Sequence, residues 1–322
     1  MIGIGVDVGG TYVKFFAVTE DGKIIKEERL DTYMDKGPKN FIKQIADFIN
    51  KWKMEFRSEI AIGMGLPGDV DHIKGVLRFG TNLKFKGKNI KNIKFGDEIY
   101  KHTGIRPFVG NDATITAWGV YELQLKKKYQ NVLVFAMGTG IGGGLIINGS
   151  LYQGSHGSAG EIGHVKISMD PNAPLCGCGG RGCLEAYAGT LAIHRLVRES
   201  IKKHPKSCLA KVVGNQEKFK IALVSDAAKQ KCKQAQDVWD QVGRSIGVGI
   251  AGACMTLDLD AVVLAGGVSR AAPYFMPALK KELDAQKIRT PFDKLKILTS
   301  KVSESGGVGA ALYAIDCRKN GY

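Results

Sequence analysis

The chain has 322 residues, of which 44% are hydrophobic and 24% are charged, a composition typical of a globular protein that buries a large core. Its length predicts two domains. No apolar run approaches the roughly 20 residues of a membrane-spanning helix. Met1 leads directly into an apolar strand without a basic segment, so we expect neither a membrane anchor nor a secretory signal, and a cytoplasmic location.

The formal net charge of +15 raises the question of nucleic-acid binding. The 46 Lys and Arg residues are scattered, however, and the densest run is Lys126-Lys127-Lys128, with no basic stripe in which aromatic residues interleave. A lysine-rich solvated surface explains the charge, and a general attraction for anionic substrates such as nucleotides is the alternative. We therefore expect no nucleic-acid partner.

The first segment has the pattern strand, glycine turn, strand. Residues 2–6 are apolar, Asp7-Val8-Gly9-Gly10-Thr11 has turn composition, and the apolar pattern resumes over 13–18. Glycines let backbone N–H groups converge on phosphate oxygens, and a carboxylate at a strand end can hold a metal ion or its water. Taken alone, the segment is slightly better explained as an ordinary hairpin with Asp in its turn.

Strand and helix patterns then alternate. A turn at Glu20-Asp21-Gly22 precedes a strand over 24–30, and apolar residues recur at helical spacing from Phe41 to Trp52. Another buried strand is expected over 60–65.

Asn111-Asp112 lies where a short strand over 108–110 ends and a helix over 112–123 begins. Transfer of a phosphoryl group to a sugar hydroxyl needs a carboxylate within hydrogen-bond reach of that hydroxyl. Asp is also a favoured residue at a helix N-cap, so the local pattern leaves both interpretations open.

The opening pattern is repeated in the middle of the chain. Residues 132–137 are apolar, Gly138 to Gly143 form a second glycine turn, and a strand over 145–147 leads to the hairpin dipeptide Asn148-Gly149. We interpret the repeat as an internal duplication at domain scale. Two such turns would form opposing jaws on a polyphosphate.

Gly138-x-Gly140-x-x-Gly143 formally matches the dinucleotide-binding fingerprint, which has to open a helix. Here a strand and a hairpin follow, so a Rossmann fold is rejected. The chain also contains no P-loop of the Gly-x4-Gly-Lys-Ser/Thr type, which indicates another nucleotide-binding architecture.

Seven cysteines, an odd number, argue against a complete disulfide framework. Three of them, Cys176, Cys178 and Cys183, follow His164 at short spacings in a glycine-rich loop, and one imidazole with three thiolates suits a closed, structural zinc site. Coincidence is the alternative. The other four are isolated, and we interpret them as small apolar fillers: Cys208, Cys232, Cys254 and Cys317.

Two carboxylates flank this cluster, Glu161 before His164 and Glu185 after Cys183. A zinc loop that fixes both would orient them onto sugar hydroxyls, although solvated surface glutamates need no such explanation. Helices are expected near Glu185–Lys203 and over 222–257. A strand over 261–265 then runs into Gly266-Gly267, and a helix over 306–318 closes the chain.

Together these residues resemble the ROK family of sugar kinases and repressors, within the superfold of actin and hexokinase. The run Gly-His-x11-Cys-x-Cys-Gly-x-x-Gly-Cys-x-Glu from Gly163 to Glu185 is highly specific for that family, and the likeness covers essentially the whole chain. It implies a two-lobed α/β, actin-like ATPase (RNase H-like) duplication with mixed sheets flanked by helices. Residues 1–110 would form a small lobe, on which a C-terminal helix (305–322) packs, and residues 111–304 a large lobe with the zinc loop.

The resemblance also implies site residues, with ATP, Mg²⁺ and structural Zn²⁺ as cofactors. Asp112 would be the base that deprotonates the sugar 6-hydroxyl. The sugar pocket would consist of Gly65, Asn82, Asn111, Asp112, Glu161, His164 and Glu185. The phosphates and adenosine of the donor would lie against Asp7, Gly9, Gly10, Thr11 and Lys14, then Gly138, Thr139 and Gly140, and finally Gly266 and Gly267. His164 would contact a sugar hydroxyl with one ring nitrogen and zinc with the other. The remaining zinc ligands would be Cys176, Cys178 and Cys183.

Glucose is the hexose that the resemblance favours, because Ala159-Gly160-Glu161-Ile162-Gly163-His164 has the glucokinase form. Two departures weaken this choice: no Trp stands four residues after Asn82, and Thr114 replaces the usual Asn or Arg. The alternatives are an N-acetylglucosamine or N-acetylmannosamine kinase, or polyphosphate as donor. A sugar-sensing repressor is not expected, because no helix-turn-helix segment precedes the strand at Ile2, and Asp112 with both turns argues against a non-catalytic scaffold. Relatives suggest a homodimer or higher homo-oligomer.

Overall fold

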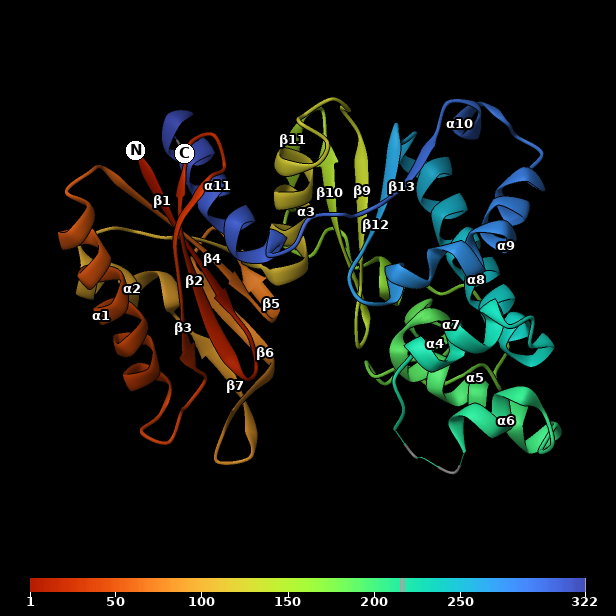
Figure 1. Cartoon of the computed structure of the whole chain (residues 1–322). Helices are drawn as coiled ribbons and strands as arrows, with labels where there is room; N and C mark the ends of the chain where they lie inside the picture. Colours follow the sequence, from red (N-terminus) through yellow and green to blue (C-terminus); the bar gives the residue numbers. More distant parts are fainter. Residues whose placement is uncertain (215, 217, 322) are drawn as a thin grey trace. The chain divides into compact units, whose positions relative to one another are not determined.

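The computed structural model describes residues 1–214, 216 and 218–321 (Figure 1). The chain forms two compact units. The first comprises residues 1–130, 144–160 and 301–322, and the second comprises 131–143 and 161–300. This grouping places residues 111–130 with the N-terminal sheet. The division into lobes at residue 110 stays a prediction.

A five-stranded mixed sheet forms the centre of the first unit, in the order β3-β2-β1-β4-β8. β1 pairs antiparallel with β2 and parallel with β4, so the expected strand, glycine turn and strand form a hairpin. The strands are β1 (Ile2–Val8), β2 (Tyr12–Thr19), β3 (Ile24–Asp31), β4 (Ile60–Leu66) and β8 (Phe108–Asn111).

A second sheet repeats this order with later strands, β11-β10-β9-β12-β13. If the five strands of each sheet are numbered along the chain, their spatial order is third, second, first, fourth, fifth in both sheets. This shared order confirms the predicted duplication. β10 carries the chain from the second unit into the first. These strands are β9 (Val132–Met137), β10 (Ile141–Ile147), β11 (Ser150–Tyr152), β12 (Ala261–Ala265) and β13 (Lys296–Thr299).

The two faces of β1 pack against different helices, because successive side chains of a strand point to opposite faces. Ile4 and Val6 join the apolar core formed with α1 (Pro38–Phe56), which lies with α2 (Phe95–Thr103) on one face of the sheet (Figure 1). The opposite face carries glycines. A side-chain carbon on Gly5 would lie 1.9 Å from a backbone oxygen of α11 (Ser305–Lys319), so only glycine permits this approach.

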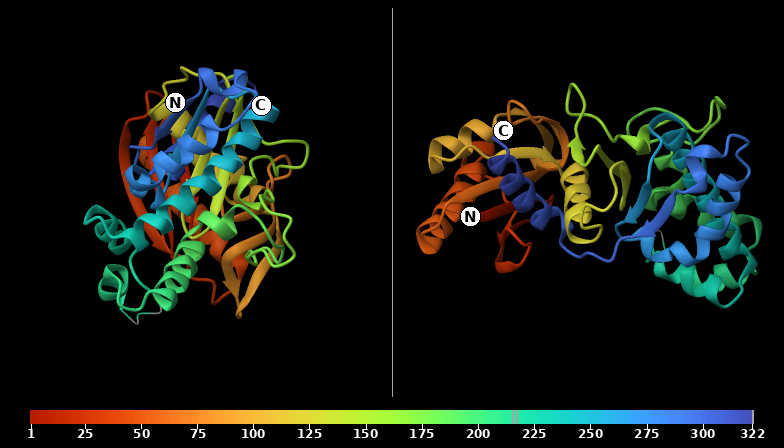
Figure 2. Two further views of the ribbon diagram at one scale, coloured as in Figure 1. Left: turned by 90° about the vertical axis from the view of Figure 1, so that its right-hand side faces the viewer. Right: turned by 90° about the horizontal axis from the view of Figure 1, so that it is seen from above.

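Both helical stretches predicted in the second unit are present, but each is interrupted, and the helices over 208–213, 272–284 and 290–293 were not predicted. The stretch expected near 185–203 breaks at Gly189, and the stretch expected over 222–257 breaks at residues 230–232, where Lys231 has a φ of 61°. α8 and α9 pack side by side (Figure 2). The helices are α4 (Glu185–Ala188), α5 (Thr190–Lys203), α6 (Cys208–Val213), α7 (Ala222–Lys229), α8 (Lys233–Leu257), α9 (Ala272–Asp284) and α10 (Thr290–Asp293), with 3₁₀ turns η1 (Ile162–His164) and η2 (Val268–Ala271).

The first unit also contains a small antiparallel sheet that the sequence did not reveal, with the order β5-β6-β7. Its strands are β5 (Gly68–Asp71), β6 (Val76–Phe85) and β7 (Lys88–Ile93), and α3 (Asp112–Leu123) completes the unit. Within the described part of the chain, no helix is both long enough and apolar enough to cross a membrane.

Candidate active site and metal centre

The β1–β2 turn brings two sets of predicted ligand-binding residues together. The backbone N–H of Gly9 donates to the carbonyl of Tyr12 at 2.9 Å, and the Thr32 hydroxyl donates to the carbonyl of Gly9 at 2.7 Å. A side-chain carbon on Gly10 would lie 3.1 Å from the carbonyl oxygen of Asn82. The first phosphate-type turn therefore lies against a residue expected in the sugar pocket.

Asp7 is a partly buried residue near the end of β1, directly across from Lys14 on β2. Burial raises the pKa of the Asp7 carboxyl above its ordinary value, while the charge of Lys14 opposes this rise and that of Glu304 adds to it. The Lys14 Nζ lies 2.6 Å from an oxygen of Glu304. A carboxylate held in this way, with a strong cost of desolvation, is suited to a cation or its water.

The carboxyl ends of the parallel strands β4 and β8 gather Gly65, Asn111 and Asp112. The Asn111 side chain accepts hydrogen bonds from the N–H groups of Ala113 and Thr114, so Asn111 is the N-cap of α3, and it donates to the carbonyl of Gly68 at 2.9 Å. Asp112 is the first residue of the helix, and its Oδ1 accepts from the N–H of Ala113 at 2.9 Å.

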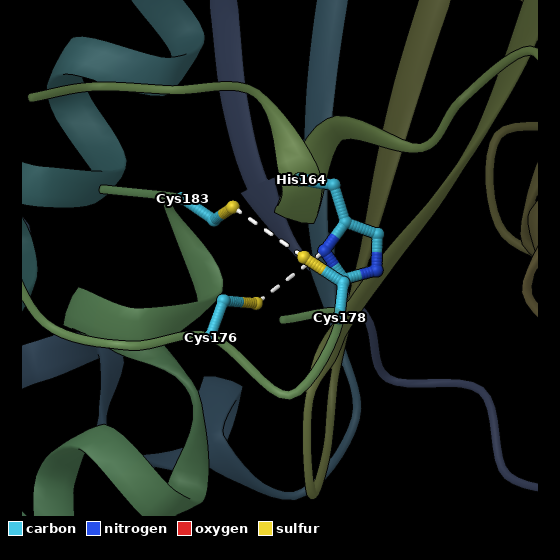
Figure 3. Close-up of side chains that lie close together, drawn as sticks. All are labelled: His164, Cys176, Cys178 and Cys183. Atoms are coloured by element: carbon cyan, nitrogen blue, oxygen red, sulfur yellow. Dashed lines mark hydrogen bonds between the residues drawn. The ribbon is translucent and has the colours of Figure 1, made fainter. Parts of the chain in front are cut away.

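In the second unit, His164 and three cysteines form the predicted cluster (Figure 3). Their ligand atoms all lie within 4.8 Å of one another. The Nδ1 of His164 lies 3.6 Å from the Sγ of Cys176, and the Sγ atoms of Cys178 and Cys183 are 3.8 Å apart. The four side chains come from η1 and from the loop that precedes α4.

These separations fit a tetrahedral ion. Zn–S bonds of about 2.3 Å place two sulfurs about 3.8 Å apart in a tetrahedron, as for Cys178 and Cys183. Burial raises the pKa of the Cys176 and Cys183 thiols, whereas the backbone N–H of Gly180 lowers that of Cys178. Buried thiols with a raised pKa become thiolates at neutral pH beside a cation, so the donor set and its surroundings suit a bound metal.

The flanking carboxylates differ in their surroundings. The Oε2 of Glu161 is 4.0 Å from the Nε2 of His164, so this ring nitrogen faces Glu161 while Nδ1 faces the sulfurs. Glu185 instead points toward the second glycine turn: its Oε2 accepts from the N–H of Ile141 at 2.9 Å, and its Oε1 lies 3.3 Å from the Sγ of Cys176. No pattern in the sequence indicated this backbone contact.

The second glycine turn and Gly266-Gly267 lie at the ends of neighbouring parallel strands, β9 and β12. The N–H of Gly138 donates to the carbonyl of Gly140 at 2.9 Å, which closes the turn before the strand β10. Gly266 has a φ of 91°, and a side-chain carbon there would lie 2.4 Å from the carbonyl oxygen of Met137. The turn therefore runs into a strand, as expected, and not into a helix.

Each unit thus assembles its own share of the predicted residues. The first unit holds Asp7, Gly9, Gly10, Thr11, Lys14, Gly65, Asn82, Asn111 and Asp112. The second holds Gly138, Thr139, Gly140, Glu161, His164, Cys176, Cys178, Cys183, Glu185, Gly266 and Gly267. Thr190 was not anticipated: its hydroxyl donates to the carbonyl of Gly138 at 2.7 Å. A Thr at a helix start has many explanations, so its identity alone could not reveal this contact.

One interpretation of the cysteines was wrong. Cys208 and Cys232 are not isolated fillers but form a disulfide, with their Cα atoms 5.9 Å apart. The bond joins the start of α6 to the residue before α8. Cys254 and Cys317 are buried free thiols, as expected.

Known proteins resemble the chain over nearly its whole length. The model of the ROK family matches residues 3–316. A glucokinase of Thermotoga maritima is 33% identical over 309 residues, which cover 96% of this chain and 95% of the relative. An N-acetylmannosamine kinase of Yersinia pestis is 29% identical, covering 97% of this chain and 98% of the relative.

Solved structures of ROK family proteins also resemble the chain over nearly its whole length. A ROK family glucokinase from Streptomyces griseus, in complex with glucose and AMPPNP, has a TM-score of 0.74 and 27% identity, covering 98% of this chain and all (100%) of that one. A ROK family transcriptional regulator, a homologue of the E. coli MLC protein, has a TM-score of 0.83 and 26% identity, covering 98% of this chain and 78% of that one. The chain belongs to the ROK family.

Proposed function

We propose that this chain is an ATP-dependent hexose kinase that transfers the terminal phosphoryl group of ATP to the 6-hydroxyl of D-glucose. The observation that carries the proposal is the arrangement at the end of β8. There Asn111 caps the helix, and the carboxylate of Asp112 stands at the helix start, beside Gly65.

The class of activity follows from the relatives. A member of the ROK family that is 33% identical to a glucokinase along almost its full length is a sugar phosphotransferase. The identity of the sugar is the finer part of the proposal, because an N-acetylmannosamine kinase is 29% identical to the same chain.

Asp112 would act as the general base. A carboxylate within hydrogen-bond reach of the attacking hydroxyl accepts its proton as the oxygen approaches phosphorus, and positioning supplies most of the remaining rate. Since Asn111 supplies the helix cap, capping is not what requires an Asp at position 112. The sugar pocket would be lined by Gly65, Asn82, Asn111, Glu161, His164 and Glu185.

The two glycine turns would hold the donor. Its phosphates would be approached by Gly9, Gly10 and Thr11, with Lys14 nearby, and by Gly138, Thr139 and Gly140. Gly266 and Gly267 would lie under the adenosine. Mg²⁺, when bound with ATP, would neutralise charge on the phosphates, and Asp7 would hold the ion or its water.

We further propose that His164, Cys176, Cys178 and Cys183 hold a structural Zn²⁺. The sulfur–sulfur and sulfur–nitrogen separations support this ion, and four protein ligands leave no open position for catalysis. The orientation of His164 is consistent with a second role, because its Nε2 faces away from the sulfurs and is available to a sugar hydroxyl.

A coupled assay of ADP release would test the function across glucose, N-acetylglucosamine and N-acetylmannosamine, each at several concentrations. The proposal expects the highest kcat/KM for glucose. A clear preference for an N-acetylated hexosamine would instead establish the alternative kinase. Phosphorylation with polyphosphate in the absence of ATP would identify a different donor.

No turnover with any hexose or donor would contradict the kinase proposal and leave a sensor or scaffold role. We also expect a cytoplasmic homodimer or higher homo-oligomer, which light scattering after size exclusion would test.

A further inference from the structure

The segment that follows the metal-ligand loop, Glu185–Thr190, lies along the second glycine turn. The Oε2 of Glu185 accepts from the backbone N–H of Ile141 at 2.9 Å. A side-chain carbon on Gly140 would lie 2.0 Å from that same oxygen, so the carboxylate occupies the space that any other residue would fill. The glycine at position 140 therefore admits Glu185 as well as shaping the turn.

The other end of the segment contacts the other end of the turn. The hydroxyl of Thr190 donates to the carbonyl of Gly138 at 2.7 Å, and its backbone N–H lies 3.4 Å from the same oxygen. A side-chain carbon on Gly189 would lie 3.4 Å from the carbonyl oxygen of Thr139. Each of the four residues from 138 to 141 thus meets the segment 185–190.

The same segment is fixed by the metal loop. Glu185 stands two residues after Cys183, and its Oε1 lies 3.3 Å from the Sγ of Cys176. The N–H of Ala186 donates to the carbonyl of Cys183 at 3.0 Å, and Leu184 is fully buried. A shift of the cysteines would therefore move the carboxylate that holds the N–H of Ile141.

We propose that Glu185 and Thr190 are positioning residues that transmit the state of the metal site to the donor-phosphate turn at Gly138–Gly140, so that metal occupancy controls donor affinity. This inference rests on the proposed function, because it takes that turn to bind the donor. The inference goes beyond the proposed function because it links the metal site to nucleotide binding, whereas the sequence suggested only a link between the metal site and the sugar.

Thr190→Val tests the coupling, because it removes one hydroxyl while keeping the branched shape of the side chain. Loss of one hydrogen bond should weaken binding of AMPPNP with Mg²⁺ about 3- to 10-fold, measured by calorimetry. The dissociation constant of glucose should stay within about twofold. Thr190→Ser, which keeps the hydroxyl, should restore nucleotide binding.

Thr256→Val is the matched control. Thr256 lies on α8 in the same unit, and its hydroxyl also donates to a backbone carbonyl, that of Gly252, at 2.8 Å. Because this bond lies within one helix, its loss should leave the affinity for AMPPNP unchanged. Equal effects of the two valine variants, or equal losses of glucose and nucleotide affinity in Thr190→Val, would overturn the proposal.

Removal of the metal provides a second arm that needs no substitution. Wild-type protein treated with a chelator and still folded by circular dichroism should bind AMPPNP more weakly, and added Zn²⁺ should restore binding. Unchanged nucleotide affinity after verified metal loss would also overturn the coupling. A protein that binds neither AMPPNP nor any hexose would contradict the proposed function itself, which is a distinct result.

Discussion

Asn111 caps the helix whose first residue is Asp112. Asn111 thus stabilises the helix start, while the neighbouring Asp112 has the proposed catalytic role. We predict that Asp112→Asn lowers kcat by roughly 10²- to 10⁴-fold. The melting temperature should change little, because the cap is intact. Steady-state kinetics with calorimetric unfolding would measure both effects.

Asn111→Ala, in contrast to Asp112→Asn, should lower the stability of the protein. Loss of a helix N-cap costs about 1 kcal/mol of unfolding free energy, and the bond to Gly68 is lost as well.

Near-normal turnover in Asp112→Asn would show that Asp112 is not the base.

The metal cluster gives the next prediction. Cys178→Ser removes one sulfur ligand from the cluster, so the protein should lose zinc, unfolding free energy and sugar affinity together. Metal content by plasma mass spectrometry, melting temperature and the KM for glucose report the three effects. A variant that stays metal-loaded and fully active would refute a structural zinc. Cys254→Ser is a control, since Cys254 is a buried free thiol outside the cluster.

The Cys208–Cys232 disulfide closes a loop with a sequence separation of 24 residues. A cross-link of that length stabilises the folded state by about 3 kcal/mol in the chain-entropy model. Reductant should therefore lower the melting temperature by several degrees. The double variant Cys208→Ser/Cys232→Ser should melt at the lower temperature whether or not reductant is present.

A wild-type melting temperature that is insensitive to reductant, with free thiols verified, would contradict this stabilisation. The result also concerns location, because disulfides are rare in the cytosol of most organisms, hyperthermophiles excepted. The bond is the one feature described above that argues against the expected cytoplasmic location.

Asp7 provides a prediction with a pH dependence. Burial raises the pKa of its carboxyl in the folded state, so the native protein binds this proton more tightly than the unfolded chain does. The contribution of Asp7 to stability is therefore greatest below its unfolded pKa of about 4 and falls as the pH rises through the folded value. At neutral pH the ionised form destabilises the fold.

Asp7→Asn should consequently be more stable than the wild type at pH 7, by up to about 1 kcal/mol, while phosphoryl transfer is lost. The difference in stability should shrink toward about pH 4. Urea unfolding at both pH values measures it. A variant less stable than the wild type at pH 7 would show that the charge of Asp7 is compensated in the native state.

Much of the fold could be predicted from apolar patterns. The apolar residues at helical spacing from Phe41 to Trp52 are the buried face of α1. The helix that begins at Asp112 ends at Leu123, as expected. Strand β10 begins at Ile141, four residues before the expected Leu145, because glycines carry little strand signal although Gly144 packs closely against Ala117 of α3. The sheet β5-β6-β7 was missed because β5 and β7 are short and largely polar.

The site was predictable where residue type decides the chemistry, as in the group of His164 with three cysteines. It was not predictable where tertiary structure sets the direction of a side chain. Glu185 was expected to face a sugar, and its contact with the N–H of Ile141 depends on how the intervening loop folds. The pairing of Cys208 with Cys232 likewise depends on two helices meeting in space.

The order in which the ribosome makes this chain has a consequence for the first unit. The glycine face of β1 is completed by α11, so this sheet face stays open until residues 305–319 have emerged. At about 5–20 residues per second the delay lasts some tens of seconds. Residues 161–300 of the second unit are already synthesised by then. The sheet made first is thus the one completed last, and its exposed strands are the part of the nascent protein that chaperones would need to shield.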